Sequence, residues 1–341
     1  MDLKKRFKDA IYIGLGLFLI GMLMLRADVT DTLDIISGIR VLPLLLVLGL
    51  YFINTASKVV RWFGILKAMG ASNLGIKVLP IFLTSLALNN STPGKIGGEP
   101  VRAYMLKEHT GNSGTMGLAS IFVEKSLDIL AIIVLAVSGI IFLIVTLGYD
   151  DVKGMVYATT IGGSVIIVLI VVLMNRRFHE LMIRGIHRFS LFLTKGSKSG
   201  RIHKAANRIE DMSKRFNISI GNIVRRRSTT FGVVLMTSAI WLNESLRFYI
   251  ILNALPADIN ISFPAAVAAV SLANILGFIL PFGSGNVLGG ASVVELLTGD
   301  QTSAVAGSIT QVVTSLWISI PIGVISLYYL KRRSKKKREG N

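Results

Sequence analysis

The sequence contains no cysteine, which excludes disulfide bonds and catalysis by a thiol. Charged residues are also scarce. They make up 16% of the 341 residues, whereas hydrophobic residues make up 52%. Soluble domains carry about 25% charged residues. The composition therefore predicts an integral membrane protein rather than a soluble domain.

Signatures of enzymes are absent as well. No HExxH, GxSxG, Walker or dinucleotide-binding pattern occurs in the chain. The four histidines, His109, His179, His187 and His203, lie in basic regions without the spacing of metal ligands. We therefore expect no catalytic residues, no metal site and no cofactor.

Apolar runs predict an all-α, polytopic membrane protein with about six full spans. Each run is about long enough, or longer than needed, to cross the hydrocarbon core as a helix. The six runs cover residues 10–25, 41–57, 126–147, 155–174, 231–252 and 303–330. Two further apolar runs, residues 78–88 and 263–282, are ambiguous, and the first is too short to cross.

The formal net charge of +18 is distributed along the chain in blocks. Lysine and arginine concentrate in residues 1–9, 58–77, 176–227 and 331–338, and the loops between these blocks carry mainly aspartate. Cytoplasmic loops of membrane proteins are enriched in lysine and arginine. The pattern predicts a multi-pass protein of the plasma membrane with both termini in the cytoplasm. Without an RNA- or DNA-binding motif, we expect no nucleic-acid partner.

The same charges indicate that both ambiguous runs are re-entrant hairpins. Basic residues precede residues 78–88, and Lys107 and His109 follow the glycine-rich stretch NNSTPGKIGGEPVR (89–102). Both ends of this segment are thus expected on the cytoplasmic face. If residues 263–282 crossed fully, the basic carboxyl end would lie outside, so we predict a second hairpin that opens outward.

The two hairpin regions resemble each other at an offset of 186 residues. RWFGILKAM, starting at Arg61, aligns with RFYIILNAL, starting at Arg247, and SLA at 85–87 recurs at the same offset. With a short insertion, PGKIGG (93–98) matches PFGSGNVLGG (281–290). Because the charges orient the two copies oppositely, we predict an inverted-topology repeat, an architecture that places transport sites at the repeat interface.

These patterns divide the chain into four parts. They are a first membrane half (1–175, with the cytoplasm-opening hairpin at about 78–106), a connector (176–227), a second membrane half (228–331, with the outside-opening hairpin at about 263–299) and a basic tail (332–341). The connector contains two basic amphipathic patterns. They are expected to lie on anionic headgroups of the inner leaflet or, alternatively, to bind a regulatory partner.

Ionisable side chains within the predicted membrane segments are the candidates for a functional site. A charge inside the bilayer is costly unless it pairs or faces a polar cavity. The candidates are Lys95, Glu99, Arg102, Glu124, Lys125, Asp128, Glu244, Arg247 and Glu295. Non-helical backbone at Gly94, Gly97, Gly98, Gly289 and Gly290 is similarly tolerated only if it is buried in protein or lines such a cavity. The alternative role for these glycines is close helix packing.

Several of these charges are interpreted as pairs. Glu124 and Asp128 share a helix face, so a cation from the first hairpin, Lys95 or Arg102, is expected beside them. This group either binds substrate or ties the hairpin to its supporting helix; a third alternative is a carboxylate that exchanges protons during transport.

In the second half, Glu244 and Arg247 are spaced as an internal ion pair. Arg61 matches Arg247 in the repeat and is interpreted as a marker of the cytoplasmic boundary.

Three motifs carry a resemblance to a known family: PGKIGGEPVRAYML (93–106), FVEKSLDIL (122–130) and LPFGSGNVLGGASVVELL (280–297). The chain resembles the flippase-like transmembrane family that includes the membrane part of lysylphosphatidylglycerol synthase. The resemblance implies movement of charged phospholipids or polyprenyl-linked lipids between leaflets. It singles out Glu99, Arg102, Glu124, Asp128 and Glu295. The chain departs from the family at Lys125, where arginine is usual, and in its longer second glycine-rich run.

The sequence thus predicts a lipid flippase or transporter. Lys95 and Arg102 would contact a headgroup phosphate, Glu124 and Asp128 would position those cations or a basic headgroup, and Glu295 would act from the other half. Two alternatives remain. One is a membrane subunit that presents a lipid-linked substrate to a separate transferase, and the other is a secondary transporter of small solutes.

Overall fold

The computed structural model describes residues 3–92, 97–174, 227–280 and 282–339, and all regular secondary structure in these ranges is helical. The helices are α1 (Leu3–Arg26), α2 (Val29–Ser37), α3 (Val41–Ala68), η1 (Gly75–Lys77), α4 (Val78–Asn90), α5 (Gly98–Thr110), α6 (Gly114–Leu147), α7 (Tyr149–Met174), α10 (Arg227–Leu252), α11 (Phe263–Ile279), α12 (Ser284–Thr298), α13 (Gln301–Val312), η3 (Val313–Trp317) and α14 (Ile318–Glu339). The predicted all-α class is confirmed. The connector and most of PGKIGG lie outside the described residues.

Three helical stretches in the described ranges are long and apolar enough to cross a membrane: Val41–Ala68, Gly114–Leu147 and Gln301–Arg332. They contain three of the predicted spans. The remaining three predicted spans fall within α1, α7 and α10.

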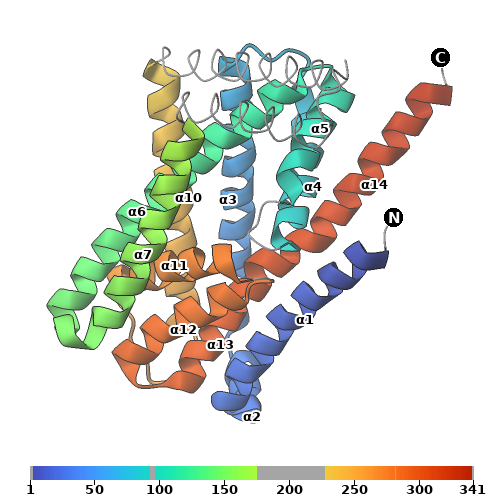
Figure 1. Cartoon of the computed structure of the whole chain (residues 1–341). Helices are drawn as coiled ribbons and strands as arrows, with labels where there is room; N and C mark the ends of the chain where they lie inside the picture. Colours follow the sequence, from blue (N-terminus) through green and yellow to red (C-terminus); the bar gives the residue numbers. More distant parts are fainter. Residues whose placement is uncertain (1–2, 93–96, 175–226, 281, 340–341) are drawn as a thin grey trace, which may run out of the picture.

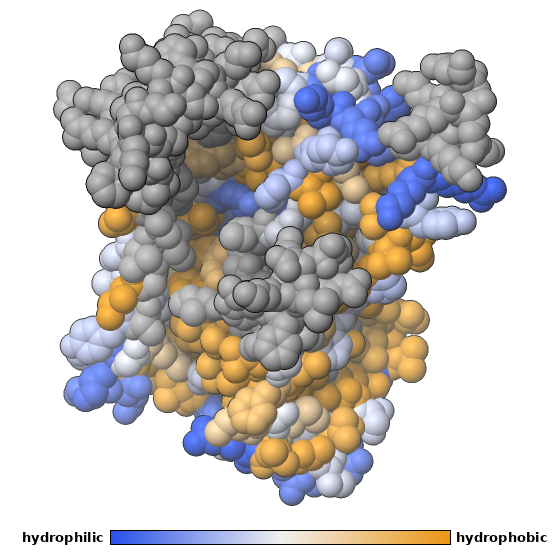
Figure 2. Space-filling model, turned by 45° about the vertical axis from the view of Figure 1, so that its right-hand side comes forward, coloured by the Kyte–Doolittle hydropathy of each residue, from blue (hydrophilic) through white to orange (hydrophobic). Residues whose placement is uncertain are grey.

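The exposed surface fits a membrane protein. Large apolar side chains are exposed around the molecule, among them Leu42, Val145 and Phe231. Figure 2 shows that such apolar residues dominate the middle of the molecule, whereas hydrophilic residues gather toward its two ends. Such an apolar surface is suited to contact with lipid rather than with water.

The two ends of the molecule differ in charge. In Figure 1 the start of α10 and the end of α14 lie at the upper end, and both carry lysine or arginine. Helix α2 and the α6–α7 and α12–α13 turns lie at the lower end, and they carry Asp28, Asp150 and Asp300. The block pattern of charge in the sequence therefore corresponds to a separation of charge in space.

Helices α3 and α10 run side by side through the centre of the molecule, and two pairs of shorter helices flank them. In the first pair, α4 and α5 pack on each other, and α4 also packs against α14. In the second pair, α11 and α12 pack on each other, and α11 also packs against α6. Each short pair thus packs against the long helix of the other half of the chain.

Close backbone contacts hold each pair together. A Cβ atom at Gly98 would overlap the carbonyl group of Ser85, so α5 can approach α4 only with glycine at this position. In the second pair, a Cβ at Gly289 would lie 2.7 Å from the Cα of Ala273. Gly289 lies inside α12 and not at its start, so close helix packing, the alternative role, accounts for it.

The first turn of α5 is capped by one side chain from the end of α4 and one from just beyond it. Asn89 Oδ1 accepts a hydrogen bond of 2.7 Å from the Gly98 amide, and Thr92 Oγ1 accepts one of 3.1 Å from the Gly97 amide. The first amides of a helix have no partners within it, and the lipid core offers none. Polar Asn89 and Thr92 therefore supply these partners within the protein.

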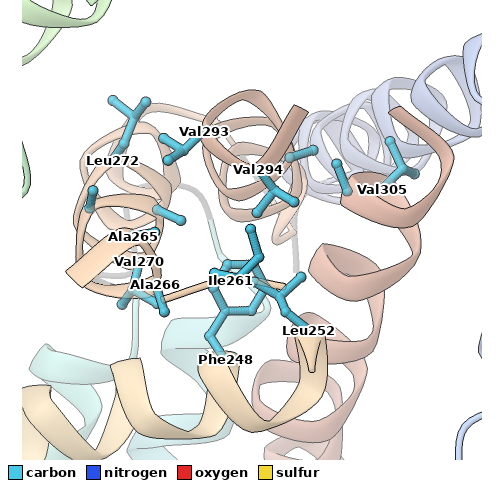
Figure 3. Packing of buried hydrophobic residues seen from close by; sticks show 14 of the residues in the cluster. Phe248, Leu252, Ile261, Ala265, Ala266, Val270, Leu272, Val293, Val294 and Val305 are labelled. Carbon is cyan, nitrogen blue, oxygen red and sulfur yellow. The ribbon is translucent and has the colours of Figure 1, made fainter. Parts of the chain in front are cut away.

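The largest buried apolar cluster lies between α10, α11, α12 and α13. Phe248 and Leu252 of α10 contact small or branched side chains such as Ala266, Val294 and Val305 (Figure 3). The alanines of α11 allow its neighbours to approach closely. This packing fixes the second helix pair against α10 and α13.

Candidate functional site

Four charged side chains form a buried group where α3, α5 and α6 meet: Arg61, Arg102, Glu124 and Asp128. We call this group the charge cluster. The side chains of Arg61, Arg102 and Glu124 are 1%, 2% and 5% exposed, and that of Asp128 is 13% exposed. Charges this deeply buried require partners, because desolvation is costly.

Arg61 and Asp128 form the strongest pair of the charge cluster. Nη1 of Arg61 lies 2.7 Å from Oδ1 of Asp128, and Nη2 lies 3.0 Å from Oδ2, the bidentate arrangement that favours arginine over lysine. Two side chains of helix α10 form further hydrogen bonds with this pair. Trp241 Nε1 donates to Asp128 Oδ1 at 3.1 Å, and Arg61 Nη1 also donates to Thr237 Oγ1 at 2.8 Å.

Glu124 links the two arginines. Its Oε2 accepts a hydrogen bond of 3.0 Å from Arg102 Nη1, and its Oε1 lies 3.5 Å from Arg61 Nη2. The guanidinium of Arg102 lies 5.0 Å from the ring centroids of both Trp62 and Phe82, within range of a cation–π interaction. The expectation that Arg102 pairs beside Glu124 and Asp128 is confirmed for Glu124, whereas Asp128 pairs with Arg61.

A third ion pair lies at the edge of the charge cluster. Lys125 Nζ is 3.0 Å from Oε1 of Glu99, and these side chains are 28% and 15% exposed. Together with the Arg102–Glu124 pair, this contact ties α5 to α6. Tying the hairpin to its supporting helix was one of the three alternatives for the group of Glu124, Asp128 and their cation.

The second half contains a looser group of charges. Oε2 of Glu244 lies 3.5 Å from Arg247 Nη1 and 3.9 Å from Lys58 Nζ, which confirms the internal Glu244–Arg247 pair. Nη2 of Arg247 donates to the backbone oxygen of Thr314 at 3.1 Å. The guanidinium also lies 5.2 Å from the ring centroid of Tyr51. Among the described residues, Arg247 thus has no bidentate carboxylate partner comparable with Asp128.

Contacts between α3 and α10 join positions that differ by 186 residues. Asn54 Nδ2 donates to the backbone oxygen of Ile240 at 2.7 Å. Lys58 and Glu244 are separated by the same interval. Arg61 also contacts Thr237, and Arg247 contacts Tyr51. At the same offset Arg61 matches Arg247 and Tyr51 matches Thr237, so these two contacts are equivalent in the two halves.

The structure also corrects the interpretation of Arg61 as a boundary marker. Helix α3 extends to Ala68, beyond the predicted end at residue 57, and buries Arg61 almost completely. The missed signal was the number of carboxylates. Glu124 and Asp128 need two cations, and Arg61, the match of Arg247 in the repeat, is the second. Thr237 and Trp241 had no distinguishing signal in the sequence.

Other predicted residues lie apart from the charge cluster. Glu295 lies one turn before Gly299, the C-cap of α12, and within the described residues its carboxylate has no ion pair. The structure does not place it beside Glu124. Gly290 lies inside α12, close to Ser308 and Phe248. Lys95 and Gly94 lie outside the described residues.

No group of three histidine, cysteine or acidic side chains gathers as a metal site in the ranges that the structure describes. The arrangement consists instead of buried ion pairs and aromatic rings, which can hold and orient charge.

A family model described as the lysylphosphatidylglycerol synthase TM region matches residues 10–323. The chain belongs to this family.

Similar proteins are consistent with membership of this family. A "UPF0104 membrane protein" of Methanothermobacter thermautotrophicus is 26% identical over 333 residues, which cover 95% of this chain and 96% of the relative. A second protein of that name from the same organism is 24% identical over 80% of this chain and 79% of the relative. "Glycosyltransferase AglD" of Haloferax volcanii is 24% identical over 84% of this chain, but only 48% of that protein is covered. No solved structure matches.

Proposed function

We propose that the protein moves a charged lipid, either a phospholipid or a polyprenyl-linked lipid, between the leaflets of the plasma membrane. The charge cluster carries this proposal. Four charges buried among lipid-facing helices are expensive to maintain, and such groups mark substrate pathways in membrane proteins. The cluster also lies where α10 of the second half meets α3 and α6 of the first, as expected for a site between two halves.

An inverted repeat with two re-entrant hairpins is part of the proposal. Three observations support it: the reciprocal packing of α4 on α14 and of α11 on α6, the α3–α10 contacts at an offset of 186, and the same offset in the sequence. The hairpins would open to opposite sides, the first to the cytoplasm, with both termini on that side.

Arg102 is the arginine best suited to a lipid phosphate. In the described residues, Nε is buried without a hydrogen-bond partner in both arginines. Arg61 already uses both Nη atoms on Asp128, whereas Arg102 contacts Glu124 through Nη1 alone, so Arg102 has the freer guanidinium, including its Nε. A phosphate oxygen would satisfy this nitrogen in a charge-assisted hydrogen bond. Glu99 and Lys125 lie at the more exposed edge of the cluster, where the headgroup would enter while the acyl or prenyl chains stay in lipid.

Reconstitution of the purified protein in vesicles tests this function. We expect a fluorescent anionic phospholipid in the inner leaflet to become accessible to an impermeant quencher much faster with the protein than in empty vesicles. The variant Arg102→Ala should slow this movement by tenfold or more, and Lys67→Ala, which removes an exposed cation above Phe63, should not. Lipid movement at the same rate in empty vesicles and in those with protein would contradict the proposal.

A second function is favoured by one relative. The printed name of AglD is that of a glycosyltransferase. A membrane subunit that presents a lipid-linked substrate to a separate transferase is therefore the alternative. In that case vesicles with the purified protein alone would show no lipid movement, and a transferase would become more active when the protein is added. Uptake of a small solute without lipid movement would instead indicate a secondary transporter.

A further inference from the structure

A small cavity with both polar and apolar residues in its walls lies in the second half, apart from the charge cluster. Its volume is about 20 Å³, which is room for one water-sized particle. Helices α10, α11, α12 and α13 and the segment η3 contribute its walls. The polar residues that line it are Glu244, Asn274, Asn286, Ser308, Gln311 and Ser315.

The side-chain amide groups of two lining residues each donate a hydrogen bond to the backbone. Asn274 Nδ2 donates to the backbone oxygen of Val270 at 2.9 Å, and Gln311 Nε2 donates to the backbone oxygen of Glu244 at 3.5 Å. Because only an N–H group can pair with a carbonyl, the amide oxygens of Asn274 and Gln311 are the atoms left for the cavity. The hydroxyl of Ser315 donates to the backbone oxygen of Gln311. The side-chain oxygens of Asn274, Gln311 and Ser315 are therefore available as acceptors, and the Ser308 hydroxyl can turn its lone pairs toward a cation.

Two of the lining oxygens are buried without a hydrogen-bond partner in the described residues. They are Oγ of Ser308, a residue that is 2% exposed, and Oε1 of Gln311. Buried polar atoms are normally paired, and an unpaired one is costly. Both residues line the same cavity, so one bound particle can satisfy both atoms.

Glycine at position 290 maintains this space. A Cβ atom there would lie 2.8 Å from Ser308 Oγ and 3.4 Å from the ring of Phe248. The facing wall contains η3, a π-helical segment of Val313–Trp317. Pro321 follows in α14 and has no N–H group for the carbonyl of Trp317, the last residue of η3. Such segments are frequent at functional sites.

We propose that this cavity binds a small monovalent cation, Na⁺ or hydronium. Asn274, Gln311, Ser308 and Ser315 each offer an oxygen, and a carboxylate also lines the cavity. A water molecule donates only two hydrogen bonds, whereas a cation attracts all of these oxygens at once. The net charge around the cavity favours a monovalent ion, because Arg247 and Lys58 already lie close to the carboxylate of Glu244 and offset its negative charge. A divalent ion such as Ca²⁺ generally needs more carboxylates.

Binding at this site does not depend on the identity of the transported substrate. Its use as a coupling site, in which an ion gradient drives lipid movement, rests on the proposed function. The position suits coupling, because the cavity lies between α10, on which the two halves meet, and the second helix pair. Ion binding can be measured without any lipid assay, so failure of one proposal is distinguishable from failure of the other.

The test is thermal unfolding of the full-length protein in lipid nanodiscs. NaCl is titrated against choline chloride at constant ionic strength, and pH is then varied without Na⁺. If Na⁺ is the ligand, Tm should rise by roughly 5 °C at a saturating concentration. If hydronium is the ligand, Tm should rise on acidification alone. In either case Ser308→Ala should raise the half-saturating ion concentration at least tenfold, and Gln311→Leu should do the same.

Ser326→Ala is the matched control. Ser326 is also a buried serine, but it bonds to the backbone oxygen of Ile322 in α14 and does not line the cavity. Its ion response should equal that of the unmodified chain. The proposal is overturned if Tm of the unmodified chain responds to neither Na⁺ nor pH, which would indicate a structural water only. An unchanged response in both Ser308→Ala and Gln311→Leu would overturn it equally.

Discussion

The two central arginines occupy matching positions in the sequence but have different surroundings. Arg61 is held by two oxygens of Asp128, approached by Glu124 and bonded to Thr237. Arg247 has one carboxylate oxygen at 3.5 Å and a backbone carbonyl. The first half thus surrounds its arginine with carboxylates, whereas the second half contains a small cavity near its own arginine. Matching positions in the two halves can therefore have different surroundings and bind different ligands.

The largest effect should come from breaking the Arg61–Asp128 pair. Replacing Arg61 by methionine leaves a buried carboxylate without its bidentate partner, which costs about 3–5 kcal/mol. We expect a large fall in Tm in nanodiscs. Lys153→Ala is the control, because its pair with Asp150 at 3.6 Å is exposed, and surface pairs contribute at most about 1 kcal/mol. Equal Tm values for the two variants would contradict the buried role of Arg61.

A smaller but clear effect is expected at Gly98. Alanine would overlap the carbonyl of Ser85 and push α5 away from α4, and such overpacking typically costs about 1–3 kcal/mol. The matched control is Gly49→Ala in α3, where a Cβ meets nothing within 4 Å. Thermal unfolding of both variants checks this. If Gly98→Ala unfolds at the temperature of Gly49→Ala, the close approach of the two helices is wrong.

The smallest effect is expected at Lys58. Its side chain is 27% exposed and lies 3.9 Å from Glu244, so Lys58→Met should lower stability by no more than about 1 kcal/mol. This result would sharpen the contrast with Arg61, one turn further along α3. A loss in Tm as large as that of Arg61→Met would show that the second group of charges is as tightly paired as the first.

How much the sequence predicted depends on how local each interaction is. The Arg102–Glu124 pair was predictable, because both residues belong to neighbouring motifs and each needs a counter-charge. Arg61 was misinterpreted because its partner lies 67 residues away and because the predicted span ended before it. An apolar run ends at the first charges, whereas the helix continues when those charges have buried partners.

Glu295 shows a different source of error. Glu295 and Glu99 both follow a glycine-rich run in the sequence. Glu99, however, lies in the first turn of α5, whereas Glu295 lies one turn before the end of α12. Gly289 and Gly290 are part of the second helix and do not precede it. The spacing of glycines alone does not reveal whether they form a loop or a packing surface.

The central claim is that the two helix pairs open to opposite sides of the membrane. The chain has no cysteine, so single cysteines can be introduced without background. Ile76 precedes the first pair and Glu108 lies in the last turn of α5, whereas Asn260 and Gln301 flank the second pair. With an impermeant maleimide applied to intact cells, we predict labelling at Asn260 and Gln301 only, and labelling at Ile76 and Glu108 only after the membrane is opened. Labelling of the two positions of one pair from opposite sides would contradict the account.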